Sequence, residues 1–327
     1  MDTTEIEERL RQNKEYTDST IKTYLSTFNG LVSKYQEKYK INLDNKKPSF
    51  LLKFKTVQKV IDREEKTTTQ ENRYKTALII FKLFYPDRAE IIKFYSDKLN
   101  TRSAENRNFI NTQVKTETQA ENWTTPEELK KVINDLKEDL EKIDVLQFTA
   151  DTIPREIFKK FMIFILLSLN NTYSIRNEWG DMEYLLIENP NLPSDKNYII
   201  YDKKNDNFKV ILNHHKNVKK QGKKSFIITD KILIHNLKAW FMVNKNGYLL
   251  PLQNKQAPIG TNGVSHLLTG FFKDTLNKNI STSLIRHITA TEDLKDTPTI
   301  QETKEQNEKV INKYLHNTKQ HQQYRKM

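Results

Sequence analysis

Several residue types and patterns are absent or rare in this 327-residue chain, and each absence excludes a class of protein. The chain has no cysteine, which excludes a disulfide scaffold, a zinc ribbon and a thiol nucleophile. Seven glycines and nine prolines exclude collagen-like and glycine-rich low-complexity chains. No stretch reaches the roughly 18–20 apolar residues that a membrane span requires, and the polar, acidic beginning lacks the apolar core of a secretory signal. The sequence therefore predicts a soluble, intracellular protein without a membrane partner.

The charge balance is strongly basic. Lysine and arginine number 54 against 42 acidic residues, a formal net charge of +12. Such an excess favours nucleic acid as a partner, because phosphate contacts release counterions; a lysine- and asparagine-rich composition alone is the other explanation. Lysine outnumbers arginine 43 to 11, and between Arg155 and Arg325 the only arginines are Arg176 and Arg286. An arginine that persists in such a background indicates a site that needs a planar, permanently charged guanidinium.

Helical periodicity dominates the first third of the chain. An apolar stripe that includes Ile21, Tyr24 and Phe28 predicts a helix over 19–39, capped by Asp18 or Ser19. Further helices are predicted from Pro48, over 67–85 and over 89–101, and residues 103–123 are predicted to be a polar connection. These patterns predict a helical domain over 1–115, a linker over 116–124 and a second domain over 125–327.

The second domain is predicted to be helical around one small sheet. Thr125 and Pro126 are typical of a helix start, and the apolar run within 154–170 predicts a buried helix. β-Branched segments over 197–206, 208–216 and 223–229 predict a three-stranded antiparallel β-meander. Helices are predicted again over 230–244, 261–277 and 283–296, and from about residue 300. The predicted fold class is α+β, mainly α with a small antiparallel meander.

Cationic and nucleophilic side chains follow one another in a distinctive order through the second domain. Arg176 follows the buried helix, Lys216 ends the second predicted strand, and Arg286 and His287 are adjacent. His316 and Tyr324 stand eight residues apart near the end of the chain. Each alone is most often a surface ion-pair residue, a solvated lysine or a frayed end. Their order makes them candidates for one site.

Together these residues resemble the catalytic set of the tyrosine recombinase (phage integrase) family. The segment Ser283–Thr291, SLIRHITAT, is similar to the family's His-x-Leu-Arg-His-Thr-Phe-Ala-Thr box, and Leu315-His316 followed by Tyr324 is similar to its Leu-Gly-His and tyrosine. The resemblance spans residues 160–327 and extends loosely to the N-terminal part, which looks like the family's helical core-binding domain. It looks most like the integrases of virophages, other eukaryotic DNA viruses and mobile elements.

The resemblance implies a site-specific DNA recombinase that cleaves and rejoins strands through a 3′-phosphotyrosyl bond at Tyr324. It implies that Arg176 and Arg286 hold the scissile phosphate, that Lys216 protonates the leaving 5′ oxygen, and that His287 and His316 bind the phosphate or move the tyrosine proton. It implies no cofactor, metal or ATP. The partners implied are double-stranded DNA and, on DNA, a homo-tetramer. The location implied is intracellular, in the host nucleus, a viral factory or the virion.

The sequence departs from the family pattern at several positions. Ser283 replaces the first histidine of the box and supplies no cation. Glu178, which the resemblance implies orients a histidine or arginine and does not touch DNA, lies two residues after Arg176 instead of three. Lys219 and Lys220 are alternatives to Lys216. A type IB-like DNA topoisomerase and a non-catalytic DNA-binding relative are the alternative functions; the scattered carboxylates do not support a two-metal transposase.

The remaining histidines have simpler predicted roles. His214 and His215 lie beside Lys216, where they contact DNA or form strand surface. His235 and His266 are interpreted as structural. His321 competes with His316 for its role, because both lie on the same late segment.

Overall fold

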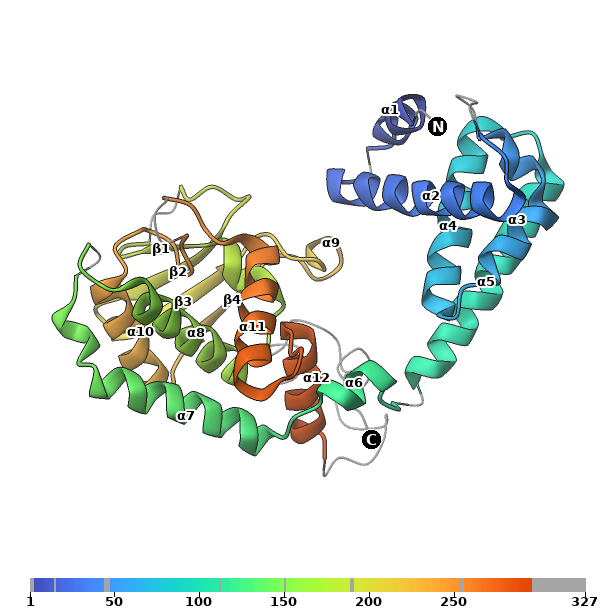
Figure 1. The fold of residues 1–327 in the computed structure, drawn as a ribbon. Coiled ribbons are helices and arrows are strands. Elements are labelled where there is room, and N and C mark those ends of the chain that lie inside the picture. The colour runs from blue at the N-terminus through green and yellow to red at the C-terminus, as the bar shows by residue number, and fades with distance from the viewer. Residues whose placement is uncertain are drawn as a thin grey trace. The chain divides into compact units, whose positions relative to one another are not determined.

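The protein consists of two units of unlike architecture. The computed structural model describes residues 3–14, 16–43, 48–111, 113–149, 151–188, 191–252 and 256–295. Contacts divide the chain into residues 1–112 and 113–327 (Figure 1). Within the described residues the first unit is helical, and the four strands belong to the second. The predicted α+β class is confirmed.

Helices of the first unit enclose one aromatic-rich core. That core includes Phe28, Tyr35, Tyr74, Phe81 and Tyr95, all essentially buried. The elements are α1 (Thr4–Gln12), α2 (Asp18–Tyr39), the 3₁₀ turn η1 (Ser49–Leu52), α3 (Phe54–Ile61), α4 (Thr67–Phe84) and α5 (Ala89–Asn111).

Helix α2 shows how the local pattern forms a helix. The predicted stripe is confirmed, since Ile21, Tyr24 and Phe28 are buried on one face. The predicted cap at Asp18 or Ser19 is wrong, because the Thr17 side chain accepts the hydrogen bond from the Thr20 N–H. Thr17 has extended backbone angles, as a helix cap requires.

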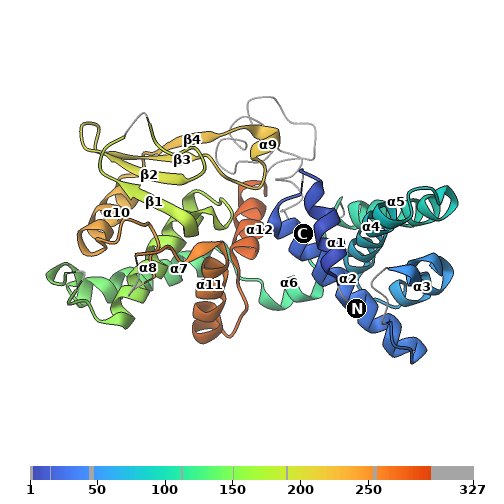
Figure 2. The same ribbon diagram turned by 90° about the horizontal axis from the view of Figure 1, so that it is seen from above.

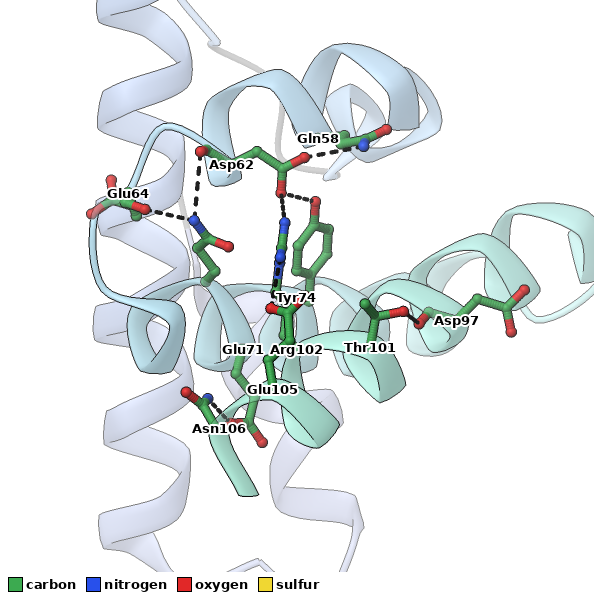
Figure 3. Close-up of polar contacts among 11 residues, drawn as sticks. Gln58, Asp62, Glu64, Glu71, Tyr74, Asp97, Thr101, Arg102, Glu105 and Asn106 are labelled. Carbon is green, nitrogen blue, oxygen red and sulfur yellow. Dashed lines mark hydrogen bonds and ion pairs between the residues drawn. The ribbon is translucent and has the colours of Figure 1, made fainter. Parts of the chain in front are cut away.

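Helix α5 extends ten residues beyond its predicted end at Thr101. The segment from residue 103 was predicted to be a polar connection, but its polar side chains have partners on α4. Ser103 Oγ donates to Glu71 Oε1 at 2.6 Å. The Asn106 amide donates to the other Glu71 oxygen (Figure 3). A polar contact between two helices leaves no apolar period in the sequence, so the end of this helix was predicted too early.

Asp62, at the end of α3, joins three helices of the first unit (Figure 3). Its carboxylate accepts hydrogen bonds from Tyr74 Oη at 2.8 Å, Gln58 Nε2 at 3.0 Å and Arg102 Nη2 at 3.3 Å. Burial by itself raises the pKa of Asp62, but the three hydrogen bonds outweigh burial and hold the pKa below its ordinary value. The carboxylate therefore stabilises the unit in its charged form.

We expect Asp62→Asn to lower the free energy of unfolding of the first unit by about 1–3 kcal/mol at neutral pH. Because the folded-state pKa lies below the unfolded value near ~3.9, this stabilisation is present above about pH 4 and is lost as the pH falls through the folded-state pKa. Urea-dependent hydrogen exchange in α4, measured at neutral and acidic pH, gives the free energy of unfolding of the unit and its change with pH.

The control is Asp97→Asn, whose side chain is exposed on α5. The wild type should lose more stability on acidification than Asp62→Asn does. Equal losses in the two proteins would contradict this account of Asp62.

A buried helix is central to the second unit. The predicted buried helix is confirmed as α8 (Arg155–Thr172), where ten residues from Phe158 to Asn170 are buried. It packs against four helices, α7, α10, α11 and α12. The helical elements of the unit are α6 (Glu117–Asn122), α7 (Pro126–Lys142), η2 (Val145–Gln147), α8, η3 (Asn177–Asp181), α9 (Val218–Gln221), α10 (Lys231–Val243), α11 (Gly260–Leu276) and α12 (Thr282–Asp293). None of the helices in the described parts of the chain is long and apolar enough to cross a membrane.

The predicted linker over 116–124 is instead partly helical. Helix α6 begins with a capping box in which Thr116 Oγ1 accepts from Gln119 N and Gln119 Oε1 accepts from Thr116 N. Asn122, at the end of α6, is buried and accepts a hydrogen bond from the Asn279 N–H. The segment is thus fastened to the second unit.

The sheet has the strand order β1-β2-β3-β4 (Figure 2). The predicted meander is confirmed as β2 (Asn197–Asp202), β3 (Asn207–Leu212) and β4 (Lys224–Ile228), paired antiparallel with Asn197 opposite Leu212 and Phe208 opposite Ile228. A fourth strand, β1 (Met182–Leu185), was not predicted and pairs parallel to β2. It is four residues long, too short for its alternation to stand out.

Candidate functional site

The segment that carries Arg176 joins α8 to η3. Ser174 is buried, and its hydroxyl donates to the Asn170 carbonyl at 2.6 Å, which continues the hydrogen bonding of α8. Arg176 is partly exposed and immediately precedes η3. The position of Arg176 therefore depends on how the segment Ser174–Asn177 is held.

Polar contacts on both sides of Arg176 fasten this segment to α12. Before it, the Ser174 hydroxyl lies 2.9 Å from Thr289 Oγ1. After it, Asn177 Oδ1 accepts from the Thr282 hydroxyl, and Asn177 Nδ2 donates to Ser265 Oγ of α11 at 2.9 Å. The backbone of Arg176 is thus held alongside α12.

Arg286 on α12 takes part in the same connection. Its Nε donates to the Ser174 carbonyl at 3.0 Å, between residues 112 positions apart in the sequence. Arg286 is 3% exposed, and a guanidinium buried this far has its plane fixed by that hydrogen bond. Arg286 therefore contacts the backbone of the residue that lies two positions before Arg176 in the sequence.

The outer face of α12 carries two more of the predicted site residues. Ser283 is exposed and His287 is partly exposed. Four residues apart, they lie one turn apart on the same helix face. Arg286, Ser283 and His287 therefore come from a single short helix.

Glu178 does not contact a histidine or arginine through a hydrogen bond in the described part of the chain. It is 9% exposed within η3, and its Oε2 is buried without a hydrogen-bond partner there. The predicted role of Glu178 in orienting such a residue stays a prediction.

The three candidate lysines lie together between β3 and β4. Lys216 precedes α9, and Lys219 and Lys220 lie on it; all three are exposed. In both views α9 lies on the same side of the second unit as α12 (Figures 1 and 2). His215 is 5% exposed, so its interpretation as strand surface is wrong, while His214 is exposed.

The rest of the predicted set is only partly described. His316, His321 and Tyr324 lie outside the described residues. His235 and His266 are exposed, on α10 and α11, which does not fit the structural role interpreted for them. Among the described residues, no three histidine or acidic side chains gather as metal ligands.

The residues that hold the two arginine segments together were not singled out from the sequence. They are Ser174, Asn177, Thr282 and Thr289, small polar residues whose only sequence signal is their position next to Arg176 and Arg286. Short polar side chains at such spacing are common in loops and helix ends, so the pattern alone does not identify them.

The comparisons with known proteins give matches among solved structures. No protein-family model matches the chain. No curated protein matches it either. Among solved structures, the chain is similar to one described as "Crystal structure of XerA recombinase", with 15% sequence identity and a TM-score of 0.39, over 99% of this chain and 94% of the other.

Gly180 allows η3, and with it the Arg176 segment, to pack against the start of α11. A Cβ at Gly180 would lie 2.7 Å from Val264 Cγ2 and from the Gly260 carbonyl carbon. We expect Gly180→Ala to lower the free energy of unfolding of the second unit by about 1–3 kcal/mol, because the backbone of α11 has to shift. All three tryptophans lie in this unit, so tryptophan fluorescence during urea unfolding measures it.

Gly270→Ala is the matched control for this prediction. Nothing lies within 4 Å of a Cβ there, in the middle of α11. An alanine should stabilise that helix by about 0.5–1 kcal/mol. If Gly180→Ala unfolds at the same urea concentration as wild type, the close approach of η3 to α11 does not position this segment.

Proposed function

We propose that this protein is a tyrosine recombinase that cleaves and rejoins DNA strands through a 3′-phosphotyrosyl intermediate. The observation that carries the proposal is the connection of the Arg176 segment to α12 beside Arg286, through Ser174 and Asn177. It supports a site in which two guanidinium groups, encoded 110 residues apart, face one phosphate.

Two arginines suit a phosphate that reacts without a metal. A guanidinium donates two parallel hydrogen bonds to phosphate oxygens and keeps its charge at any physiological pH. The Ser174 carbonyl fixes the Arg286 plane before DNA arrives. A donor that needs no reorganisation stabilises the charge that develops on the oxygens in the transition state.

The proposed residues account for every bond and proton of the cleavage step. The Tyr324 oxygen attacks phosphorus, the bond to the 5′ oxygen breaks, and a phosphotyrosyl ester forms. His287 or His316 accepts the tyrosine proton, since a phenol of pKa near ~10 is a weak nucleophile at neutral pH. Lys216, or Lys219 or Lys220, gives a proton to the leaving 5′ oxygen. Attack by another 5′ hydroxyl reverses these steps and joins new strands.

The first unit offers a basic surface for the DNA backbone. A hollow of about 550 Å³ on α2, α3 and α5 is lined by four cations and three other residues: Lys38, Lys55, Gln58, Lys59, Asp62, Arg63 and Phe94. Lys55, Lys59 and Arg63 are exposed, and Lys38 Nζ donates to the Lys59 carbonyl at 2.6 Å. Contacts from these cations would supply affinity without sequence preference.

The proposed chemistry is tested by covalent trapping. We expect the wild type to form a protein–DNA adduct on nicked duplexes of candidate element ends, with chelator present, on a denaturing gel. Tyr324→Phe should abolish the adduct, because it removes the attacking oxygen. Arg286→Ala should slow its formation by about 10²–10³-fold, the usual cost of one preorganised donor.

Tyr314→Phe is the matched control, since it removes a hydroxyl ten residues away in the sequence. An adduct that survives in Tyr324→Phe would contradict the assignment of the nucleophile. DNA binding by the wild type without any adduct on the element's own ends would instead favour a non-catalytic DNA-binding protein. Adduct formation together with relaxation of unrelated supercoiled plasmid would favour a topoisomerase.

Salt dependence tests the basic surface of the first unit. We expect Lys55→Ala with Lys59→Ala to weaken DNA binding and to reduce the slope of log affinity against log salt by about 1.8, or about 0.9 for each phosphate that the variant no longer neutralises. Fluorescence anisotropy at salt concentrations from about 50 to about 200 mM measures the slope.

The control pair is Lys137→Ala with Lys142→Ala, which removes the same charge from α7, where both lysines pair with glutamates. A slope that changes equally in both double variants would show a net-charge effect and would contradict the assignment of this surface. The homo-tetramer, the integration of viral or mobile DNA and the cellular location implied by the resemblance stay predictions.

A further inference from the structure

The connection between β3 and β4 carries a dense group of positive charges. Lysines occupy positions 216, 219, 220, 223 and 224. Like charges this close repel one another and favour an open, variable loop. A defined position for any one lysine therefore needs another group to close the loop.

His215 is that group. Of residues 213–223, all of which the structure describes, His215 alone is buried. Its Nε2 lies 2.9 Å from the Gly222 carbonyl, and its Nδ1 accepts from the Asn217 N–H at 3.3 Å. A carbonyl only accepts, so Nε2 carries the proton and Nδ1 is the acceptor. We name these two hydrogen bonds the His215 clasp.

The clasp joins the beginning of the loop to its end. Gly222 has a φ of +70°, a conformation that suits glycine, and its carbonyl accepts from the ring of His215. Between the two residues, Val218 N donates to the His215 carbonyl at 3.0 Å and Gly222 N donates to the Val218 carbonyl at 2.8 Å. The three candidate lysines all lie inside this closed loop.

The base of the loop is fixed independently of the clasp. The Asn197 side chain, at the start of β2, accepts from His214 N at 2.9 Å and donates to the His214 carbonyl at 2.8 Å. Asn197 is 5% exposed. Lys216 is therefore separated by one residue from an anchor on the sheet, and the clasp sets the path that the loop takes beyond it.

We propose that His215 is a positioning residue that holds the lysine loop in the shape needed to protonate the leaving 5′ oxygen. The inference rests on the proposed function and adds to it a residue that touches neither DNA nor the reacting atoms. It does not depend on which of Lys216, Lys219 and Lys220 gives the proton, since the clasp encloses all three. Both hydrogen bonds of the clasp go to residues of the loop itself.

The clasp is tested first in the full-length protein without DNA. Hydrogen exchange over residues 216–223 should be about tenfold faster in His215→Leu than in wild type, with exchange in α8 unchanged. His215→Gln should restore most of the protection, because its amide reaches the Gly222 carbonyl. His214→Gln is the matched control, since the anchor to Asn197 uses only the backbone of His214. Wild-type exchange in His215→Leu would overturn the clasp.

The role in proton donation is tested with DNA in which sulfur replaces the bridging 5′ oxygen. A thiolate leaves without prior protonation, because thiols are far stronger acids than alcohols. On ordinary DNA we expect His215→Leu to slow adduct formation by about 10–100-fold, within the contribution of a general acid. On the sulfur-substituted DNA its rate should be within about threefold of wild type.

The two possible failures are distinguishable. If His215→Leu loses the same factor in rate on both substrates, or loses nothing on ordinary DNA, the positioning role is overturned. An adduct formed by the wild type in the same experiment still supports the proposed function. A wild type that forms no adduct on either substrate overturns the proposed function and the positioning role with it. The hydrogen-exchange result still decides whether the clasp exists.

Discussion

One hydrogen bond, from Arg286 Nε to the Ser174 carbonyl, connects the two halves of the candidate site. It links the end of the buried helix α8 to α12 and places Arg176 and Arg286 on neighbouring segments of backbone. The contacts of Ser174 and Asn177 with α12, and the close approach of Gly180 to α11, hold the same segment in place. The proposed phosphate site would stand on rigid elements, and a site built in this way is preorganised, as electrostatic catalysis requires.

Much of this arrangement follows from local patterns in the sequence. The apolar stripe of α2, the buried run of α8 and the β-branched strands of the meander each repeat with the period of their element, so they were predictable. Arg176 and Arg286 were singled out because arginine is scarce in a lysine-rich chain, and their catalytic roles stay predictions. The roles of Tyr324 and His316, which lie outside the described residues, stay predictions.

What the sequence did not indicate depends on polar contacts between distant residues. The second half of α5 is fastened by Ser103 and Asn106 to Glu71, and β1 is a short strand that gains its place by pairing with β2. His215 resembled an ordinary strand residue until its ring was found to close the lysine loop. Such contacts produce no period along the chain, because each needs only one suitable side chain at one position.

The central claim is that Arg286 acts on the charge of the scissile phosphate. It is tested most directly with DNA in which a methyl group replaces one non-bridging oxygen of that phosphate and removes its negative charge. The account predicts that Arg286→Ala is slower than wild type by about 10²–10³-fold on ordinary DNA and nearly equal to wild type on the methylated phosphate. An equal loss on both substrates would contradict it, because Arg286 would then support the fold and not the reacting charge.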